Sequence, residues 1–454
     1  MEQRPYGAYI VYDMRRWWLL LLWPFLYALT PSPEPRTLLR VLLLCAALFG
    51  YSVAKWKSSR YRVGCTKNGF YSIGVRQGVF VRHSLHIRAE DAASVEIERT
   101  WLLALCGGRR VRVNTAGLRR RSDAVLYLPA EQVRRLFLLK DHSAQRFRAR
   151  LWPVIVTAVS GSNAAVGLLT AAPALRQLSK LLSEWFSVDA VDMLQRFPIG
   201  QLPSALRLVA NLLLIGWGVA VLNTFLRYVG FYAAVQNNQL HLVSGLFTRR
   251  DVLIDRDKIT ALELRQTLLM RLQGLYTAVI TAAGYGRDLG ARPVLIPAAD
   301  PKTLCEGLEQ LLPGYPLKEG KIKASRRSWW RYVALPLTLT ITGVLAWMAG
   351  GFWQVPAFVC TVLGIWWFAV RFLGFCGAGF GANETAVTVW YPRGLAFYRV
   401  YLPRETVDHI TVTQSVWQRR NGTCTVTVRS FGDKKRRHRV WGLPYEPVIY
   451  EIGI

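Results

Sequence analysis

Three pairs of long apolar stretches recur along the chain and constrain its architecture more than any other feature. The pairs cover about residues 17–31 and 38–55, 152–172 and 203–226, and 329–350 and 353–373. A helix of roughly 20 apolar residues crosses the hydrocarbon layer of a bilayer, which is about 30 Å thick. Tryptophans gather at the ends of these stretches, where their rings suit the headgroup level. The sequence therefore predicts six transmembrane helices arranged as three hairpins.

Charge predicts how these hairpins are oriented. The chain has 58 Lys and Arg against 28 Asp and Glu, a formal net charge of +30. Basic residues flank the open end of each hairpin, as Arg15 and Arg16 do before the first and Arg326 and Arg327 before the third. Because cytoplasmic loops carry the excess of Lys and Arg, we expect a multi-pass cell-membrane protein with both termini in the cytoplasm.

A repeated unit follows each hairpin. Gly78–Gly117 aligns without a gap with Gly245–Gly284, and a weaker third copy starts at Gly394 and ends near Gly432. Each copy contains short β-prone pieces broken by Gly, Asp and Asn, and a helical pattern follows the first two copies. The unit is thus predicted to be several antiparallel strands closed by a C-terminal helix. In the third copy only ten residues follow Pro444, so its closing helix must be short or absent.

The segment Ile254–Gly284, which begins IDRDKITALELRQT, resembles the signature of the bacterial pleckstrin-homology-like (PH-like) membrane proteins of the YdbT type. The resemblance extends over nearly the whole chain and is weakest in the third copy. It implies paired membrane helices before each domain, and a domain made of two near-orthogonal antiparallel sheets capped by one helix. It also implies a link with antimicrobial-peptide resistance and envelope stress, and it supplies no catalytic residues.

The expected fold is accordingly a multi-domain membrane protein with three cytoplasmic PH-like β domains. The predicted segments are a cytoplasmic N-terminal segment (1–16), hairpin 1 (17–55), PH-like domain 1 (56–149), hairpin 2 (150–230) with an outer interfacial helix at about 175–197, PH-like domain 2 (231–325), hairpin 3 (326–376) and PH-like domain 3 (377–454). The glycine-rich run Gly374–Gly381 at the last membrane exit is expected to be a flexible linker.

The chain shows no pattern typical of catalysis or metal binding. Its seven cysteines form no CxxC pair, and His83 and His86 fall on opposite faces of a predicted strand. No HExxH, GxSxG or phosphate-binding P-loop motif occurs. We therefore expect no enzymatic activity, no cofactor and no metal.

Basic clusters are the remaining functional signal. Beside an anionic leaflet each Lys or Arg contributes about 1 kcal/mol of attraction. The candidate contacts to an anionic surface are Arg109, Arg110, Arg112, Arg119, Arg120, Arg121, Arg249, Arg250, Lys434, Lys435, Arg436 and Arg437. A solvated face produced by the cytoplasmic excess of basic residues explains these clusters equally well. No aromatic stacking motif accompanies them, which disfavours nucleic-acid binding.

The leading hypothesis is a non-enzymatic membrane scaffold whose PH-like domains bind partner proteins or anionic lipid headgroups. Membrane lipids and a membrane protein, for which a smaller PH-like membrane protein is a candidate, are the expected partners. The alternative is a lipid or small-molecule transporter that uses the six-helix bundle. The absence of acidic residues from the predicted spans disfavours an ion-coupled transporter. The sequence leaves open the oligomeric state and whether the three domains pack together.

Overall fold

The computed structural model describes the following residues: 3–14, 35–65, 71–79, 81–88, 91–115, 124–137, 146–161, 204–236, 238–282, 293–315, 317, 322–351, 354–430 and 436–453. They fall into two compact units. The first comprises Met1–Arg146, Ala233–Ile259 and Ala282–Ala291, and the second comprises Phe147–Tyr232, Thr260–Thr281 and Arg292–Ile454.

The first unit contains a complete β domain. Helices α1 (Ala8–Met14) and α3 (Pro35–Ser58) precede it. Strands β1 (Arg60–Cys65), β2 (Tyr71–Gln77) and β3 (His83–Ile87) form an antiparallel sheet in the order β1-β2-β3. The second sheet contains β4 (Ala92–Arg99), β5 (Gly108–Thr115) and β6 (Ala124–Pro129), with the short helix α4 (Trp101–Leu105) between β4 and β5. Helix α5 (Ala130–Phe137) follows and completes the domain.

Alternating apolar residues on these strands build the core of the domain. Ile73 from the first sheet packs with Ile97, Val111 and Leu128 from the second, and Val133 of α5 completes the cluster. All five side chains are at most 2% exposed. The alternation that puts every second side chain on one sheet face therefore accounts for two sheets and a capping helix, the predicted PH-like arrangement.

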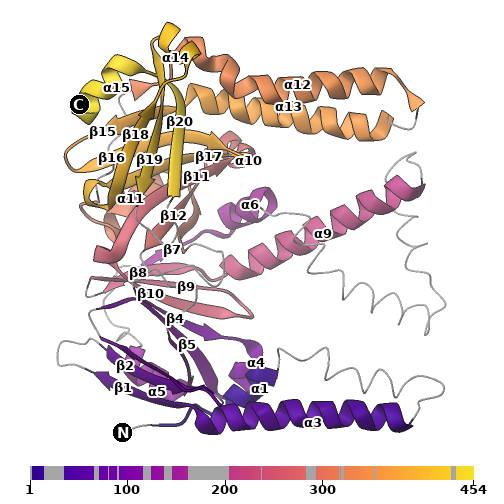
Figure 1. The fold of residues 1–454 in the computed structure, drawn as a ribbon, viewed down its shortest axis with the longest axis vertical. Coiled ribbons are helices and arrows are strands. Elements are labelled where there is room, and N and C mark those ends of the chain that lie inside the picture. The colour runs from indigo at the N-terminus through magenta and orange to yellow at the C-terminus, as the bar shows by residue number, and fades with distance from the viewer. Residues whose placement is uncertain are drawn as a thin grey trace. The chain divides into compact units, whose positions relative to one another are not determined.

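The second sheet of this domain continues into the next sequence repeat. Strands β8 (Tyr232–Gln236), β9 (Gln239–Ser244) and β10 (Arg249–Asp255) follow in the sheet order β6-β5-β4-β10-β9-β8. The junction is the antiparallel pair β4–β10, whose register runs from Arg249 opposite Arg99 to Ile254 opposite Ser94. Two repeats thus share one sheet through hydrogen bonds between their edge strands (Figure 1).

The second unit shows the same junction one repeat later. The sheet order is β13-β12-β11-β17-β16-β15-β14, and its junction is the antiparallel pair β11–β17. Its strands are β11 (Ile259–Thr267), β12 (Tyr276–Ala282), β13 (Val294–Ala299), β14 (Ile322–Lys323), β15 (Gly379–Ala382), β16 (Ala386–Arg393) and β17 (Ala396–Pro403). Its other helices include α10 (Leu268–Leu272), α11 (Pro301–Leu311), η4 (Arg326–Ser328) and η6 (Arg404–Thr406), while η3 (Arg256–Lys258), just before β11, belongs to the first unit.

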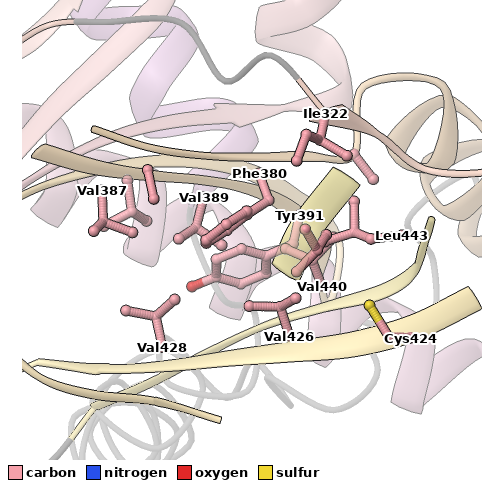
Figure 2. Packing of buried hydrophobic residues seen from close by; sticks show 14 of the residues in the cluster. Ile322, Phe380, Val387, Val389, Tyr391, Cys424, Val426, Val428, Val440 and Leu443 are labelled. Atoms are coloured by element: carbon pink, nitrogen blue, oxygen red, sulfur yellow. The ribbon is translucent and has the colours of Figure 1, made fainter. Parts of the chain in front are cut away.

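A further sheet closes the third repeat. Strands β18 (Val407–Thr413), β19 (Thr423–Ser430) and β20 (Arg436–Pro444) pair in that order, with α14 (Val416–Arg420) after β18 and α15 (Tyr445–Ile452) at the end. Figure 2 shows Phe380 and Val389 of one sheet facing Val426 and Val440 of the other. These side chains are 0% exposed. The glycine-rich run expected to be a linker is instead ordered, because α13 (Gln354–Cys376) runs into it and β15 lies within it.

Among the described residues, two helices are long and apolar enough to cross a membrane: Arg326–Met348 and Pro356–Cys376. They correspond to α12 (Trp329–Met348) and α13, which lie side by side in Figure 1. Two of the six predicted transmembrane helices are therefore supported by the described residues, and the count of six is not confirmed. Helices α3 and α9 (Ser204–Tyr228) occupy the second and fourth predicted spans. Helix α6 (Leu151–Gly161) is shorter and β7 (Arg146–Arg148) precedes it, while stretch 17–31 and the interfacial helix at 175–197 lie outside the described residues.

The α12–α13 hairpin is joined tightly to the third β domain. Tyr332, in the first turn of α12, donates its hydroxyl hydrogen to the carbonyl of Trp441 at 2.8 Å and accepts from the Trp441 backbone N–H at 3.2 Å. Its ring packs on Trp441 and Phe375, and the residue is 3% exposed. The base of the hairpin is therefore anchored in the core of the domain.

Candidate functional site

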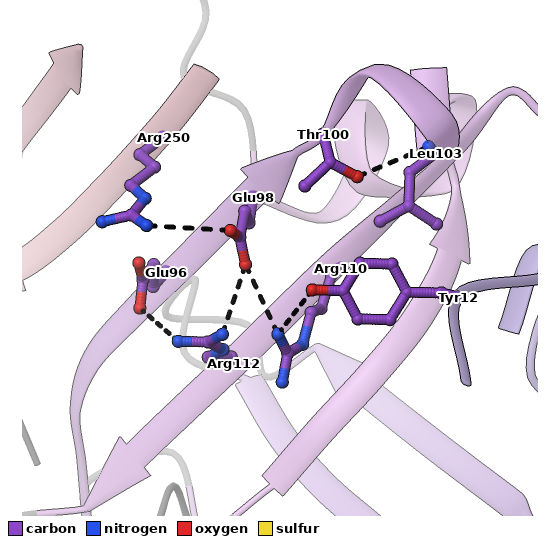
Figure 3. Close-up of polar contacts among 8 residues, drawn as sticks. All are labelled: Tyr12, Glu96, Glu98, Thr100, Leu103, Arg110, Arg112 and Arg250. Carbon is purple, nitrogen blue, oxygen red and sulfur yellow. Dashed lines mark hydrogen bonds and ion pairs between the residues drawn. The ribbon is translucent and has the colours of Figure 1, made fainter. Parts of the chain in front are cut away.

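An ion-pair cluster lies where the first two repeats share a sheet. On β4, Ile97 faces the core, so Glu96 and Glu98 lie on the opposite face. Glu98 stands between Arg110 of β5 and Arg250 of β10 in the strand register, and Glu96 stands opposite Arg112. Directly opposed charges of opposite sign are the favourable cross-strand pairing. The register thus creates the cluster drawn in Figure 3.

Glu98 is the centre of this cluster. Its Oε2 lies 3.3 Å from Arg112 Nη2 and 3.5 Å from Arg110 Nη1, and its Oε1 lies 3.9 Å from Arg250 Nη2. Only 7% of its side chain is exposed. The Arg110 guanidinium also donates to Tyr12 Oη at 3.1 Å and lies over the Tyr12 ring. One carboxylate therefore neutralises two arginines from β5 of the first repeat and one from β10 of the second.

Glu96 is held less favourably than its neighbour. Arg112 Nη1 lies 3.5 Å from Glu96 Oε2 without hydrogen-bond geometry, and Glu96 Oε1 has no hydrogen-bond partner among the described residues. Burial raises the pKa of the Glu96 carboxyl, and the attraction of Arg112 and Arg250 only partly opposes this effect. For a buried carboxyl group that lacks full pairing with cations, the neutral form is favoured relative to the charged form.

The second junction uses cations and aromatic rings at corresponding positions. Arg265 of β11 lies opposite Tyr398 of β17, where β4 and β10 have Glu98 and Arg250. The Arg265 guanidinium is 5.9 Å from the Tyr398 ring centre, and that of Arg399 is 4.6 Å from the Trp390 ring centre. Cation–π contacts of this kind contribute about 0.5–2 kcal/mol. The two junctions therefore share their backbone register but differ in side-chain chemistry.

The structure separates the twelve basic residues predicted to contact an anionic surface. Arg110, Arg112 and Arg250 are in the ion-pair cluster. Arg249 is half exposed and pairs with Asp251 at 3.3 Å. Arg109 is half-buried, and burial lowers its pKa.

The remaining candidates lie at or beyond the limits of the described chain. Arg437 is exposed on β20. Arg436 belongs to the same strand, but its side chain is not among those described. Arg119, Arg120, Arg121, Lys434 and Lys435 lie outside the described residues. The predicted residues thus do not form one group in the described parts of the chain.

Glu96 and Glu98 organise the cluster but were not predicted from the sequence as site residues. A signal was present, because alternating Val95-Glu96-Ile97-Glu98 on one strand matches Arg110-Val111-Arg112 on the next. Acidic and basic residues at the same spacing of two predict that the two sets lie on one face of the paired strands, directly opposite each other. Among the described residues, no group of three or more His, Cys, Asp or Glu side chains is placed to hold a metal ion.

Comparison with known proteins agrees with this architecture. The bacterial PH domain model matches residues 17–146, 193–312 and 331–446. The chain belongs to this family, and each matched region contains one repeat. The chain is 22% identical over 320 residues to the UPF0699 transmembrane protein YdbT of Bacillus subtilis (strain 168). The match covers 63% of this chain and spans 62% of that relative's length.

No solved structure matches the chain. The transmembrane relative, the family match and the two apolar helices together identify a membrane protein with PH-like domains. The resemblance to bacterial PH-like membrane proteins inferred from Ile254–Gly284 is thereby confirmed.

Proposed function

We propose that this protein is a non-enzymatic membrane scaffold whose PH-like domains bind partner proteins or anionic lipid headgroups on the cytoplasmic side. The observation that carries the proposal is the way the repeats are joined. Neighbouring repeats share sheets through β4–β10 and β11–β17 rather than through flexible linkers. A membrane hairpin is also fixed to its domain through Tyr332 and Trp441. Rigid connections of this kind support a scaffold role, because a scaffold keeps the binding surfaces of its domains at fixed positions.

The scaffold we propose crosses the membrane six times, with both termini in the cytoplasm. The hairpin α12–α13 has Arg326, Arg327 and Arg331 at its open end, beside the β domain. The closed end, around Gly350 and Gly351, carries no basic residue. This asymmetry supports a cytoplasmic domain under the positive-inside rule. Arginines also flank the open ends of the first two apolar pairs, although the connections at their closed ends contain basic residues such as Arg36 and Arg176.

For the binding surface we favour the two longest basic runs of the sequence, which do not belong to the cluster drawn in Figure 3. The cluster around Glu98 occupies Arg110, Arg112 and Arg250. The run Arg119–Arg121 lies between β5 and β6, and Lys434–Arg437 lies at the start of β20. Each basic residue close to an anionic leaflet adds about 1 kcal/mol of attraction. Three consecutive arginines can therefore direct this segment of the chain toward anionic headgroups.

The test of lipid binding uses the full-length chain in neutral detergent, titrated with short-chain phosphatidylglycerol and, separately, with phosphatidylcholine. The triple variant Arg119→Glu, Arg120→Glu, Arg121→Glu should bind phosphatidylglycerol at least about tenfold more weakly, since several residues of about 1 kcal/mol each are reversed. Arg393→Glu, an exposed arginine outside the clusters, should change binding less than about twofold. Equal affinity of the triple variant and the parent would remove this loop from the proposal.

A test of partner binding uses the same variants. The tagged chain would be solubilised from its native membrane, and the co-purifying proteins compared between the parent, the triple variant and Arg393→Glu. A smaller PH-like membrane protein is the candidate partner, and a role in envelope stress or antimicrobial-peptide resistance is the proposed setting. Loss of one specific protein from the triple variant alone would support partner binding at this loop. An unchanged set of proteins would count against it.

A further inference from the structure

The chain contains the same edge-to-edge junction twice, in the same register. Glu96 lies opposite Val252 in the first junction and Glu263 lies opposite Val400 in the second. Each glutamate lies four residues before a threonine, Thr100 or Thr267, that caps the following short helix.

The two valines occupy matching positions as well. Val252 and Val400 each lie three residues before the N-cap residue of a short 3-10 helix, Asp255 or Pro403. Independent landmarks on both strands therefore give one register for both junctions. We call β4 and β11 the accepting edges and β10 and β17 the supplying edges of their repeats.

Strand β18 is the accepting edge of the third repeat, and it pairs only with β19 among the described residues. Its cap Ser415 corresponds to Thr267. The buried Glu96 and Glu98 of β4, 3% and 6% exposed, correspond to Thr411 and Thr413, which are exposed. The surface that a neighbouring repeat covers at β4 is thus open at β18.

Strand β3 is the supplying edge of the first repeat, and in the described part of the chain it pairs only with β2. The offset of 167 residues matches Ser84 and Leu85 to Asp251 and Val252 of β10. Asp251 and Val252 are each 5% exposed, whereas Ser84 is exposed and Leu85 is half-buried. Within the described residues, each kind of edge therefore has one copy without a neighbouring repeat.

Over most of their length, neither strand has the residues that usually keep an edge strand from pairing with another chain. Charged side chains, especially Lys, and proline protect sheet edges from pairing with other chains. From Ile410 to Thr413 β18 has no charge and no proline, and β3 consists of His83, Ser84, Leu85, His86 and Ile87. These edges can accept another strand without burying a lysine or a proline.

We propose that β18 of one copy of this chain pairs antiparallel with β3 of a second copy, in the register of the two internal junctions. That register places Thr411 opposite Leu85. Continued one pair past the end of the first junction, Ile254 with Ser94, the same register also brings Asp408 opposite Arg88, the residue after β3. Among the three supplying strands only β3 has a basic residue at this point. The contact joins two different edges, so it is heterologous and each copy keeps one edge for the next. This self-association is independent of anionic-lipid binding, so either can fail without the other.

The first test is disulfide cross-linking between two differently tagged full-length chains in native membranes. One chain carries Leu85→Cys and the other Thr411→Cys, so only a contact between copies joins both tags. Directly opposed Cα atoms lie about 4.5–5.5 Å apart, within disulfide reach. Diagonal neighbours lie about 7–8 Å apart, so His83→Cys with Thr411→Cys should give roughly fivefold less product. The parental pair, with its native cysteines, sets the background.

Cross-links of equal yield in the on-register and diagonal pairs, or none above background, would overturn the proposal. Capture of β18 by a different protein instead of β3 would also overturn it. Thr411 is exposed and Leu85 is half-buried at the margin of its domain's core. The melting temperature of each variant should therefore stay close to that of the parent, which checks that the variants fold.

Charge exchange supplies a second and independent test. Asp408→Arg in one copy places two positive charges opposite each other and should lower the yield of the on-register cross-link roughly fivefold. Arg88→Asp in the other copy should restore it, whereas Arg88→Asp alone should lower it. Failure of the paired exchange to restore the yield would contradict the register.

A third test needs no cysteine. The double variant Thr411→Lys, Thr413→Lys should reduce the oligomer to single chains, because lysine protects an edge strand. Thr385→Lys, an exposed threonine of the same domain outside β18, should leave the assembly intact. Light scattering of the detergent-purified chain measures both, and an unchanged oligomer in the double variant would refute the contact.

Discussion

At the scale of single residues, the stability of the first unit depends strongly on Glu98. Its carboxylate is within 4 Å of three arginines and is almost fully buried. Removing one partner of a buried ion pair leaves charge uncompensated in a poorly solvated place, which costs about 3–5 kcal/mol. Here the lost negative charge is shared by three arginines, and Arg110 keeps its hydrogen bond to Tyr12. The cost should therefore lie at the lower end of this range.

We therefore predict that Glu98→Ala lowers the free energy of unfolding by about 3 kcal/mol. Glu98→Gln should cost less, because the amide oxygen still accepts hydrogen bonds from the arginines. The control is Arg249→Ala, which removes a half-exposed guanidinium from the buried Asp251. It should cost less than Glu98→Ala, because Glu98 is the shared partner of three arginines. Denaturant unfolding of the detergent-solubilised chain measures all three. Similar losses for Glu98→Ala and Arg249→Ala would show that the cluster is not buried.

Glu96 gives a pH-dependent prediction at the same scale. Burial raises its pKa in the folded chain above the ordinary value of 4.5. A raised pKa means that the folded state binds the proton more tightly, so this group favours folding below pH 4.5 and loses that contribution as pH rises through the folded pKa. The neutral variant Glu96→Gln does not titrate.

The stability of the parent minus that of Glu96→Gln should consequently fall as pH increases from about 4 toward neutrality. Thermal unfolding of both proteins at a series of pH values checks this. A difference that is constant with pH, or that grows toward neutrality, would contradict the assigned environment of Glu96.

At the scale of secondary-structure elements, the α12–α13 hairpin depends on close approach at two glycines. A Cβ added at Gly343 would lie 2.6 Å from Thr361 Oγ1, and one added at Gly364 would lie 2.5 Å from Thr340 Oγ1. Small residues let membrane helices pack closely, where van der Waals contact rather than the hydrophobic effect holds them together. Each glycine faces a threonine of the other helix.

Gly364→Leu should therefore separate the two helices and destabilise the hairpin by about 1–3 kcal/mol. Thr342→Leu, at an exposed position of α12 whose hydroxyl bonds only within its own helix, should have little effect. Limited proteolysis in detergent measures the difference. A Gly364→Leu chain as resistant as the parent would mean that the helices do not pack through this face.

Much of the element pattern follows from the sequence, and the gaps have physical causes. Apolar length predicts α12 and α13, and β-prone runs predict antiparallel strands in each repeat, because these signals are local. The glycine-rich run was wrongly expected to be a linker. Gly374 allows Pro392 to approach, and at Gly379 a Cβ would lie 2.9 Å from the carbonyl oxygen of Ile322, so here glycine serves packing rather than flexibility.

The shared sheets could not be predicted in the same way. Alternation tells which face of a strand is buried, but an edge strand presents the same backbone groups to any neighbour. Glu98 and Arg250 are far apart in sequence, and nothing local selects their pairing. The candidate arginines were therefore found as charged clusters, while the carboxylates that bind three of them were overlooked.

At the scale of the whole molecule, the proposed topology follows from how the hairpin joins its domain. Tyr332 and Trp441 fix the open end of α12–α13 to β20, so the domain must lie on the same side of the membrane as that end. Arg326, Arg327 and Arg331 at this end favour the cytoplasm, and the closed end near Gly350 has no such charge. The orientation of the hairpin in the membrane therefore determines on which side the domain lies.

Cysteine labelling in intact cells tests this topology. A membrane-impermeant maleimide should label Ala349→Cys, which is exposed at the closed end of the hairpin. It should label Arg393→Cys, exposed on the β domain, only after the membrane is permeabilised. The parental chain gives the background from its native cysteines. Labelling of Arg393→Cys but not Ala349→Cys in intact cells would place the domain outside the cell. The proposed binding of its basic residues to anionic groups in the cytoplasm would then be excluded.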